Sequence, residues 1–373
     1  MAGKSSDQPL RGSADAVRNA LAVAVQAGQP VLLWGSPGEG KSRLVESVAE
    51  QLGRPCEVVV GSVREASDFA GLPVVEQGSV SFAPPRWATR CVERPDTVVF
   101  LDELTTAAPS VQAAMLRVVL EREVGDLRLP PTVAFVAAAN PPELSAGGDD
   151  LSAPLANRFC HLDWEADPAG WSTGMLRGWA PRPVPVVPAA FAAHRDRWRA
   201  IVVGFIRSRP ATLRQVPTDV VGQGRAWPSP RTWDRAHVVA AAADAAGAGR
   251  DVIRLLVAGL LGQGPAIELL RFADELDLPD PELLLAEPDL LPTDSRVDLL
   301  LAALAGVTAA VAGDLSLDRW EAAWRVLSVA CDAGRADVAA MSATALVELR
   351  LDDWPAPRAA AAFAPMLRAA ELV

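Results

Sequence analysis

Short apolar runs recur along the chain as far as Trp164, and segments with helical spacing separate most of them. One helix is expected from about Ser13, a residue type suited to the N-cap, to Ala27. β-prone runs that alternate with helices are typical of a parallel sheet covered on both faces. The runs predict strands at Val31–Trp34, Val58–Val60, Val98–Leu101, Val133–Ala138 and Phe159–Leu162.

Two further pairs of short strands are expected outside this sheet. The segment GLPVVEQGSVSF has the pattern of a hairpin that turns at Gln77 and Gly78. The segment VGDLRLPP, which contains Gly125, predicts another short hairpin before the fourth run. Both hairpins would interrupt the regular alternation of strand and helix.

The pattern changes after Trp164, where helical spacing replaces the short apolar runs. Pro-rich stretches at 181–188 and from Leu278 to Asp294 separate the helical segments, which we expect at about 189–208, 231–247, 251–262, 264–276 and from 295 onward. We therefore predict three domains: an α/β domain over 1–166, a helical lid over 167–280 and a helical C-terminal extension over 281–373.

Composition narrows the class of protein. A chain of 373 residues and 39.3 kDa exceeds the size that one core usually serves. Its net charge of −11 argues against a general nucleic-acid or acidic-membrane surface. The longest uncharged apolar run, Leu299–Gly313, is shorter than the ~18 residues of a membrane span. No apolar signal segment opens the sequence, so we expect a soluble, cytoplasmic protein.

The four cysteines and three histidines are scattered without the spacing of a metal site. We expect the cysteines to be free, mostly buried thiols. They are Cys56, Cys91, Cys160 and Cys331.

A glycine-rich loop follows the first predicted strand and precedes a helix expected from Arg43 to Leu52. It contains one of the two lysines of the chain, and it reads Gly35, Ser36, Pro37, Gly38, Glu39, Gly40, Lys41, Ser42. This sequence matches the phosphate-binding motif GxxxxGK[ST] in its required context. Glycines let the backbone wrap around phosphate, and the helix N-terminus attracts the anion. Lys41 supplies a compact charge that a forked guanidinium could not replace.

Two carboxylates end the third predicted strand, in the segment VVFLDE. Asp102 suits a Mg²⁺ ion that Ser42 also ligates, and Glu103 suits the orientation or deprotonation of an attacking water. Such a pair could also cap the next helix. Its position after the phosphate loop favours the catalytic interpretation, so we predict a site for Mg²⁺ and ATP.

Three polar residues complete the candidate site. Asn140 ends the fourth predicted strand and could hold the water opposite the γ-phosphate, or form an Asx turn before Pro141. Arg158 precedes the fifth strand, where it could also be a surface arginine. In WPSPRTWDRA, Ser229 and Pro230 suit the N-cap and first position of a helix, which places Arg231 in its first turn.

The order of these motifs over residues 31–164 resembles that of AAA+ ATPases. The segments SDFAGLP, FLDELTTAAPSVQAAMLRVVLERE, AAANPP and LANRF resemble the MoxR-like branch more narrowly. The resemblance implies a P-loop NTPase αβα sandwich with a parallel sheet, followed by an all-α lid and the helical extension. It also implies that the hairpin at Gln77 is the helix-2 insert and the one at Gly125 the pre-sensor-1 hairpin.

The same resemblance assigns roles to the polar residues. Asn140 would be sensor 1, Arg158 an arginine finger acting on ATP in a neighbouring subunit, and Arg231 the sensor 2 residue that reaches the γ-phosphate. In related proteins a residue at the end of the second strand switches the catalytic glutamate, and Gly61-Ser62 is the candidate here. Phe69 matches a pore-loop aromatic residue, although a core position is expected.

The function predicted on this basis is ATP hydrolysis in a homo-oligomeric ring, with a hexamer expected, that remodels or matures a protein client. A protein with a von Willebrand factor A domain is the partner that the resemblance implies. Two alternatives stay open: a nucleic-acid-directed AAA+ motor, which the acidic charge disfavours, and a nucleotide-gated switch with little turnover.

Overall fold

The computed structural model describes residues 12–76, 78–141, 151–276, 278–355 and 357–363. These residues form two compact units. The first unit comprises Met1–Ala189 with Arg214–Ile267, and the second comprises Ala190–Leu213 with Glu268–Val373. The expected division into three domains stays a prediction.

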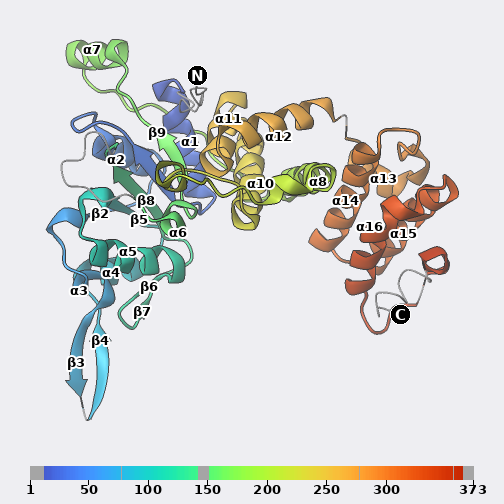
Figure 1. The fold of residues 1–373 in the computed structure, drawn as a ribbon, viewed down its shortest axis with the longest axis horizontal. Coiled ribbons are helices and arrows are strands. Elements are labelled where there is room, and N and C mark those ends of the chain that lie inside the picture. The colour runs from blue at the N-terminus through green and yellow to red at the C-terminus, as the bar shows by residue number, and fades with distance from the viewer. Residues whose placement is uncertain (1–11, 77, 142–150, 277, 356, 364–373) are drawn as a thin grey trace. The chain divides into compact units, whose positions relative to one another are not determined.

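A five-stranded parallel sheet forms the centre of the first unit (Figure 1). Its strand order is β2-β5-β8-β1-β9, so β8 separates the strand before the glycine-rich loop from the strand that ends in two carboxylates. The five predicted strands are confirmed with small shifts of their ends. Their bounds are β1 Val31–Trp34, β2 Cys56–Val60, β5 Val98–Asp102, β8 Ala134–Ala139 and β9 Cys160–Asp163.

Helices cover both faces of the sheet, because alternate residues of each buried strand point to opposite sides. Leu32 and Trp34 of β1 belong to a core with α3 (Ser67–Ala70), α4 (Arg86–Glu93) and α5 (Pro109–Glu121). On the other face lie α1 (Ala14–Gln26), which Ser13 caps as expected, and α2 (Lys41–Gln51). The predicted αβα sandwich is therefore confirmed.

Both predicted hairpins are present. One is β3 (Leu72–Glu76) with β4 (Ser79–Ala83), and it extends away from the sheet (Figure 1). Its predicted turn residue Gln77 lies outside the described residues. Val75 and Val80 face each other across this hairpin and are 74% and 59% exposed. The other hairpin is β6 (Glu123–Val124) with β7 (Leu127–Arg128).

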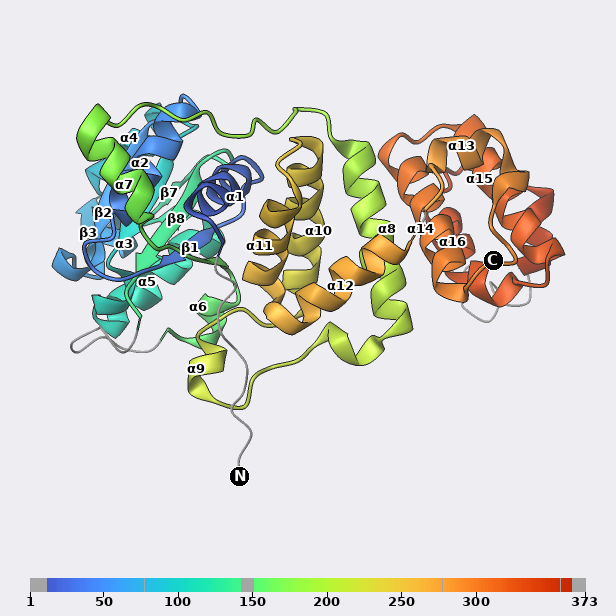
Figure 2. The ribbon, with the colours of Figure 1, turned by 90° about the horizontal axis from the view of Figure 1, so that it is seen from above.

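Of the remaining helices of the first unit, one precedes the last strand of the sheet along the chain, and the others come after that strand. Figure 2 shows the two longest, α10 and α11, beside α1, and α11 also packs against β9. The short helix α7 has no counterpart in the sequence prediction, which expected a Pro-rich linker soon after Trp164. Their bounds are α6 Ala153–Ala156, α7 Pro168–Arg177, α9 Val220–Gln223, α10 Pro230–Ala245 and α11 Arg250–Leu261.

The second unit is helical, as the sequence predicts for the C-terminal region. Helix α8 (Ala192–Ser208) packs along α14 (Val297–Gly313), and α12 (Gln263–Glu275) has residues in both units. The other helices of this unit are α13 Pro281–Ala286, α15 Leu317–Asp332 and α16 Ala336–Glu348. Among the described residues, no helix has the length and apolar character needed to cross a membrane.

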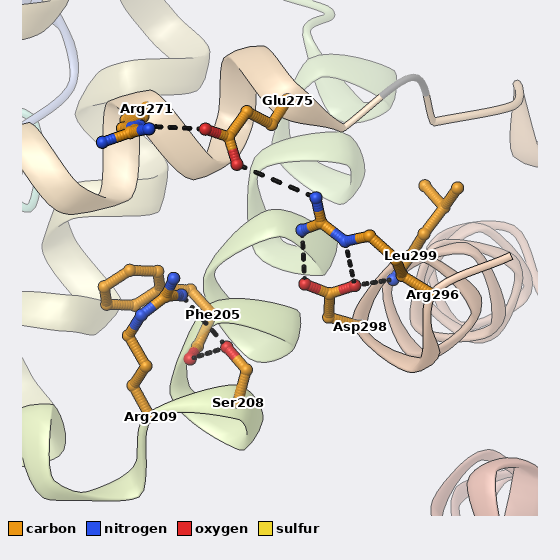
Figure 3. A network of polar contacts seen from close by, with 8 residues as sticks. All are labelled: Phe205, Ser208, Arg209, Arg271, Glu275, Arg296, Asp298 and Leu299. Carbon is orange, nitrogen blue, oxygen red and sulfur yellow. Dashed lines mark hydrogen bonds and ion pairs between the residues drawn. The ribbon is translucent and has the colours of Figure 1, made fainter.

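Aromatic side chains and ion pairs hold the second unit together. The Trp320 ring lies edge-on to the Trp324 ring, with 6.0 Å between the ring centroids, and its indole N–H donates to Leu346 O. Figure 3 shows a surface network in which Arg296 contacts both Glu275 and Asp298 and so joins the end of α12 to the start of α14. The guanidinium of Arg209 lies nearby over the Phe205 ring, 4.9 Å from its centroid. These contacts involve none of the residues that the sequence nominates for chemistry.

Candidate functional site

The glycine-rich loop joins β1 to α2, as the sequence predicts. Gly38 and Gly40 have φ angles of 82° and 78°, which residues with a Cβ rarely adopt. These two residues turn the backbone so that α2 begins at Lys41 with its N-terminus directed at the loop. The loop therefore places free backbone N–H groups and the positive end of a helix around one point, an arrangement that binds phosphate.

Lys41 lies inside this loop and is nearly buried. Its ammonium group donates to the carbonyl oxygens of Gly35 at 2.6 Å and Ser36 at 3.0 Å, and to Asn140 Oδ1 at 2.9 Å. Burial lowers the pKa of Lys41, while the nearby charges of Asp102 and Glu39 raise it. Because β8 is the neighbour of β1, the end of β8 delivers Asn140 directly to the loop. A phosphate held by Lys41 would thus be within reach of the Asn140 amide.

Ser42 and Asp102 meet across the sheet edge. The Ser42 hydroxyl donates to Asp102 Oδ2 at 2.9 Å, which brings together two oxygen side chains from α2 and β5. Mg²⁺ prefers such hard oxygen ligands and takes one or two from the protein, with the rest from phosphate and water. The donor set therefore fits the predicted Mg²⁺ ion.

Glu103 has a left-handed backbone, with φ 58° and ψ 41°, which costs about 1–3 kcal/mol in a residue other than glycine. Its N–H donates to Asp102 Oδ1 at 2.9 Å, and Thr106 Oγ1 donates to its carbonyl oxygen at 3.0 Å. Its carboxylate accepts a hydrogen bond from the Ser62 hydroxyl. The strained turn ends the direction of β5 at Glu103, and the hydrogen bond from Ser62 holds its carboxylate.

Ser62 reaches Glu103 because β2 and β5 are neighbours and end at the same sheet edge, where Val60 pairs with Asp102. Gly61 permits this approach, since a Cβ there would lie 2.7 Å from Met115 Cε. The sequence could nominate Ser62 only weakly, from its place at a strand end. Phe69, the possible pore-loop residue, is 1% exposed and lies in the core, as expected.

The segment after β9 supports the loop from the side. Trp164 donates its indole N–H to Glu39 O at 2.8 Å, and the Ala166 N–H donates to Glu39 Oε2 at 2.8 Å. The backbone at Ala166 thereby fixes the position of the Glu39 carboxylate. No sequence signal distinguished Trp164 or Ala166, because the contact joins segments 125 and 127 residues apart.

Residues 30–159 match the family model of the AAA domain, dynein-related subfamily. Over these residues the chain is similar to that family. Among solved structures, the chain is similar to one described as a full-length MCM homolog from Methanopyrus kandleri, with 15% sequence identity and a TM-score of 0.37. That match covers 71% of this chain and 56% of the homolog, so this chain spans little more than half of it.

Arg158 lies at the end of the sheet where the strands begin, opposite the end that carries the phosphate loop. It directly precedes Phe159 and β9, and its carbonyl oxygen accepts from Gln29 Nε2 at 3.2 Å, where Gln29 precedes β1. Its guanidinium donates to Pro154 O, and its Nε is buried without a hydrogen-bond partner among the described residues. Burial, and then the charge of Arg231, lower the pKa of Arg158.

Arg231 lies beside Arg158 rather than at the phosphate loop. The expected start of α10 is present: Ser229 caps it, Pro230 is its first residue, and the side chains of Ser229 and Thr232 form a capping box. Within the described residues, Arg231 forms no hydrogen bond or ion pair with the loop. The structure thus groups Lys41, Ser42, Asp102, Glu103 and Asn140 at one sheet edge, and Arg158 with Arg231 at the other.

A buried histidine joins the neighbouring strands β1 and β9. The Trp34 indole N–H donates to His161 Nδ1 at 2.9 Å, so Nδ1 must accept and His161 is neutral. Its protonated Nε2 then donates to Ala156 O at 2.9 Å. Burial lowers the pKa of His161 from 6.5 to about 4, because the imidazolium would be desolvated.

This histidine predicts a loss of stability in mild acid. Between pH 6.5 and 4 the unfolded chain binds a proton that the folded chain does not, so the free energy of unfolding falls as the pH falls. Above pH 6.5 the group has no effect. From pH 7.5 to 5 its contribution is about 2 kcal/mol. Urea unfolding at pH 7.5 and pH 5 measures this loss. The free energy of unfolding should fall more between the two pH values in the unaltered chain than in His161→Gln, and an equal fall in both would contradict the prediction.

Proposed function

We propose that this chain is an AAA+ ATPase that hydrolyses Mg·ATP and uses the turnover to remodel a protein client. The convergence of Lys41, the Ser42–Asp102 pair, Glu103 and Asn140 at one sheet edge carries the proposal. The loop and Lys41 can bind phosphate, but only Glu103 and Asn140 offer groups that act on water. Their position next to the loop favours hydrolysis over binding alone.

Each residue has a distinct part in the proposed mechanism. The loop N–H groups and Lys41 hold the β- and γ-phosphates. Glu103, directed by Ser62, orients the attacking water or accepts its proton, and Asn140 holds that water in line. Mg²⁺ held by Ser42 and Asp102 would neutralise charge on the phosphate oxygens. Within the described residues, neither Arg158 nor Arg231 forms a hydrogen bond or ion pair with the loop.

Arg158 and Arg231 therefore serve a neighbouring copy in this proposal. They lie together where the parallel strands begin, while the phosphate loop lies where the strands end. Neither arginine therefore completes the site of its own chain. The sequence interpretation gave this role to Arg158 alone. We extend it to Arg231, because the contact of α10 with the start of β9 places the two cations side by side.

A binding measurement tests the first step of the proposal. Replacing Lys41 with alanine removes a charge-assisted contact to phosphate, and ATP affinity should fall about 10–100-fold. Arg43→Ala is the matched control, since it removes an 87% exposed cation from the same helix and should bind ATP normally. Titration calorimetry with Mg·ATP measures both variants. Equal affinity of Lys41→Ala and the unaltered chain would refute the phosphate-loop assignment.

The finer proposals are a MoxR-like protein, a hexameric ring and a client with a von Willebrand factor A domain partner. They rest on the segments SDFAGLP, AAANPP and LANRF, and on the hairpin β3–β4, whose exposed Val75 and Val80 offer an apolar surface. Phosphate release by the assembled protein separates turnover from a nucleotide-gated switch. Stimulation by DNA that is lost as salt rises would instead favour a nucleic-acid motor.

A further inference from the structure

Asn157 is a buried amide between two segments that are 72 residues apart along the chain. Its Nδ2 donates to Trp227 O at 3.1 Å, and its Oδ1 accepts from the Ser229 hydroxyl at 2.8 Å. The Trp227 carbonyl can only accept, so these partners fix which end of the amide is oxygen. Asn157 is 6% exposed, so water cannot readily replace either bond.

Ser229 connects this amide to the start of α10. Its hydroxyl proton goes to Asn157, and its oxygen accepts the Thr232 N–H at 3.2 Å as the N-cap of the helix. Thr232 Oγ1 in turn accepts the Ser229 N–H at 2.8 Å. The network gives the first turn of α10 one orientation relative to Asn157.

The two ends of this network carry the two arginines. Arg158 is the next residue after Asn157, and Arg231 is two residues after Ser229. Among the described residues neither arginine forms an ion pair with a carboxylate, and the charge of Arg231 lowers the pKa of Arg158, after the larger effect of burial. Like charges repel, and fixed backbone on both sides is what keeps them together.

We propose that Asn157 is a positioning residue that sets Arg158 and Arg231 at one spacing, so that both bind the nucleotide of a neighbouring copy. This inference rests on the proposed function. Asn157 touches neither nucleotide nor the reacting atoms; it acts through the two arginines. Its loss lets the start of α10 shift relative to β9, and a shift of about 1 Å in a charged group can cost about 100-fold in rate.

The test uses the full chain with three variants. Asn157→Ala removes both bonds of the amide. Ser229→Gly removes the bond to Asn157 together with the cap bond to the Thr232 N–H, but glycine is itself accepted at an N-cap, so α10 should keep its start. Thr97→Ala is the matched control, since it removes a buried side-chain hydrogen bond to Arg94 O, away from the arginines. For each variant, ATP affinity, KM and kcat are measured.

Asn157→Ala and Ser229→Gly should keep ATP affinity and KM within about threefold while kcat falls about 10–100-fold. Thr97→Ala should keep kcat. A general loss of stability would lower ATP affinity as well, which separates it from positioning. Unchanged kcat in Ser229→Gly overturns the inference even if Asn157→Ala fails to fold.

Mixing subunits gives a second readout that a structural role would not produce. Asn157→Ala subunits have an intact phosphate loop, so mixing them with Lys41→Ala subunits should restore turnover, as should mixing Arg158→Ala with Lys41→Ala. Asn157→Ala mixed with Arg158→Ala should gain no activity over Asn157→Ala alone, because both variants impair the same pair of arginines. If only the Arg158→Ala and Lys41→Ala mixture regains activity, Asn157 is not an arginine-positioning residue. If that mixture also fails, the shared site of the proposed function is refuted as well.

Discussion

Arg158→Ala should lower the kcat for ATP hydrolysis about 10³–10⁵-fold, the range of arginine fingers in related phosphoryl transfers. The guanidinium lies at the sheet edge away from the loop of its own chain, so ATP binding by an isolated subunit should not change. Its effect should appear only in the transition state, where charge spreads over the phosphoryl oxygens. Steady-state phosphate release and ATP titration on the same sample separate the two quantities.

Arg94→Ala provides the control for Arg158→Ala. Arg94 is exposed and precedes β5, so it also lies at the amino edge of the sheet, and its loss should leave kcat unchanged. Arg158→Lys should recover little activity, because an ammonium group cannot reproduce the planar, forked contacts of a guanidinium. Turnover that is independent of both Arg158 and protein concentration would contradict the shared site.

Glu103→Gln should bind Mg·ATP with unchanged affinity and lose about 10²–10⁴-fold in kcat, as expected when a general base is removed. The amide has nearly the shape of the carboxylate and can still accept the Ser62 hydroxyl, so the strained turn should persist. Single-turnover hydrolysis of bound ATP measures the loss directly. The variant should also hold its client in a pull-down, because it binds nucleotide without releasing phosphate.

Glu93→Gln is the matched control, because it removes the same charge from an exposed position on α4. Its single-turnover rate should equal that of the unaltered chain. If Glu103→Gln hydrolyses ATP at a normal rate, another group activates the water, and the assignment of the Asp102–Glu103 pair must be revised.

Much of the α/β part of the first unit could be predicted because its signals are local. Runs such as Val31–Trp34 mark buried parallel strands, and the ends of parallel strands meet at one edge of the sheet. Lys41, Asp102 and Asn140 each end or follow such a run, so their convergence follows from strand order alone. The N-cap at Ser229 and the helix start at Pro230 could also be predicted, since they depend on adjacent residues.

What the sequence could not supply is contact over long separation. The amide of Asn157 gives no signal until Ser229 is found beside it, and Glu39 gives none until Trp164 is found beside it. The placement of Arg231 follows from the first of these contacts. The packing of helix α8 along α14 likewise joins distant segments, and the pairing of two helices depends on shape that periodicity does not encode.

The separation of the phosphate loop from Arg158 across β9 and β1 has a consequence for symmetry. If each copy offers its loop from one edge and its arginines from the other, the contact between copies is head-to-tail, and a two-fold dimer cannot satisfy both sites. Heterologous contacts close into a ring when the rotation per copy divides a full turn, and otherwise extend as a filament. In a closed ring every loop faces an arginine pair, whereas an open assembly always leaves one loop and one pair without a partner.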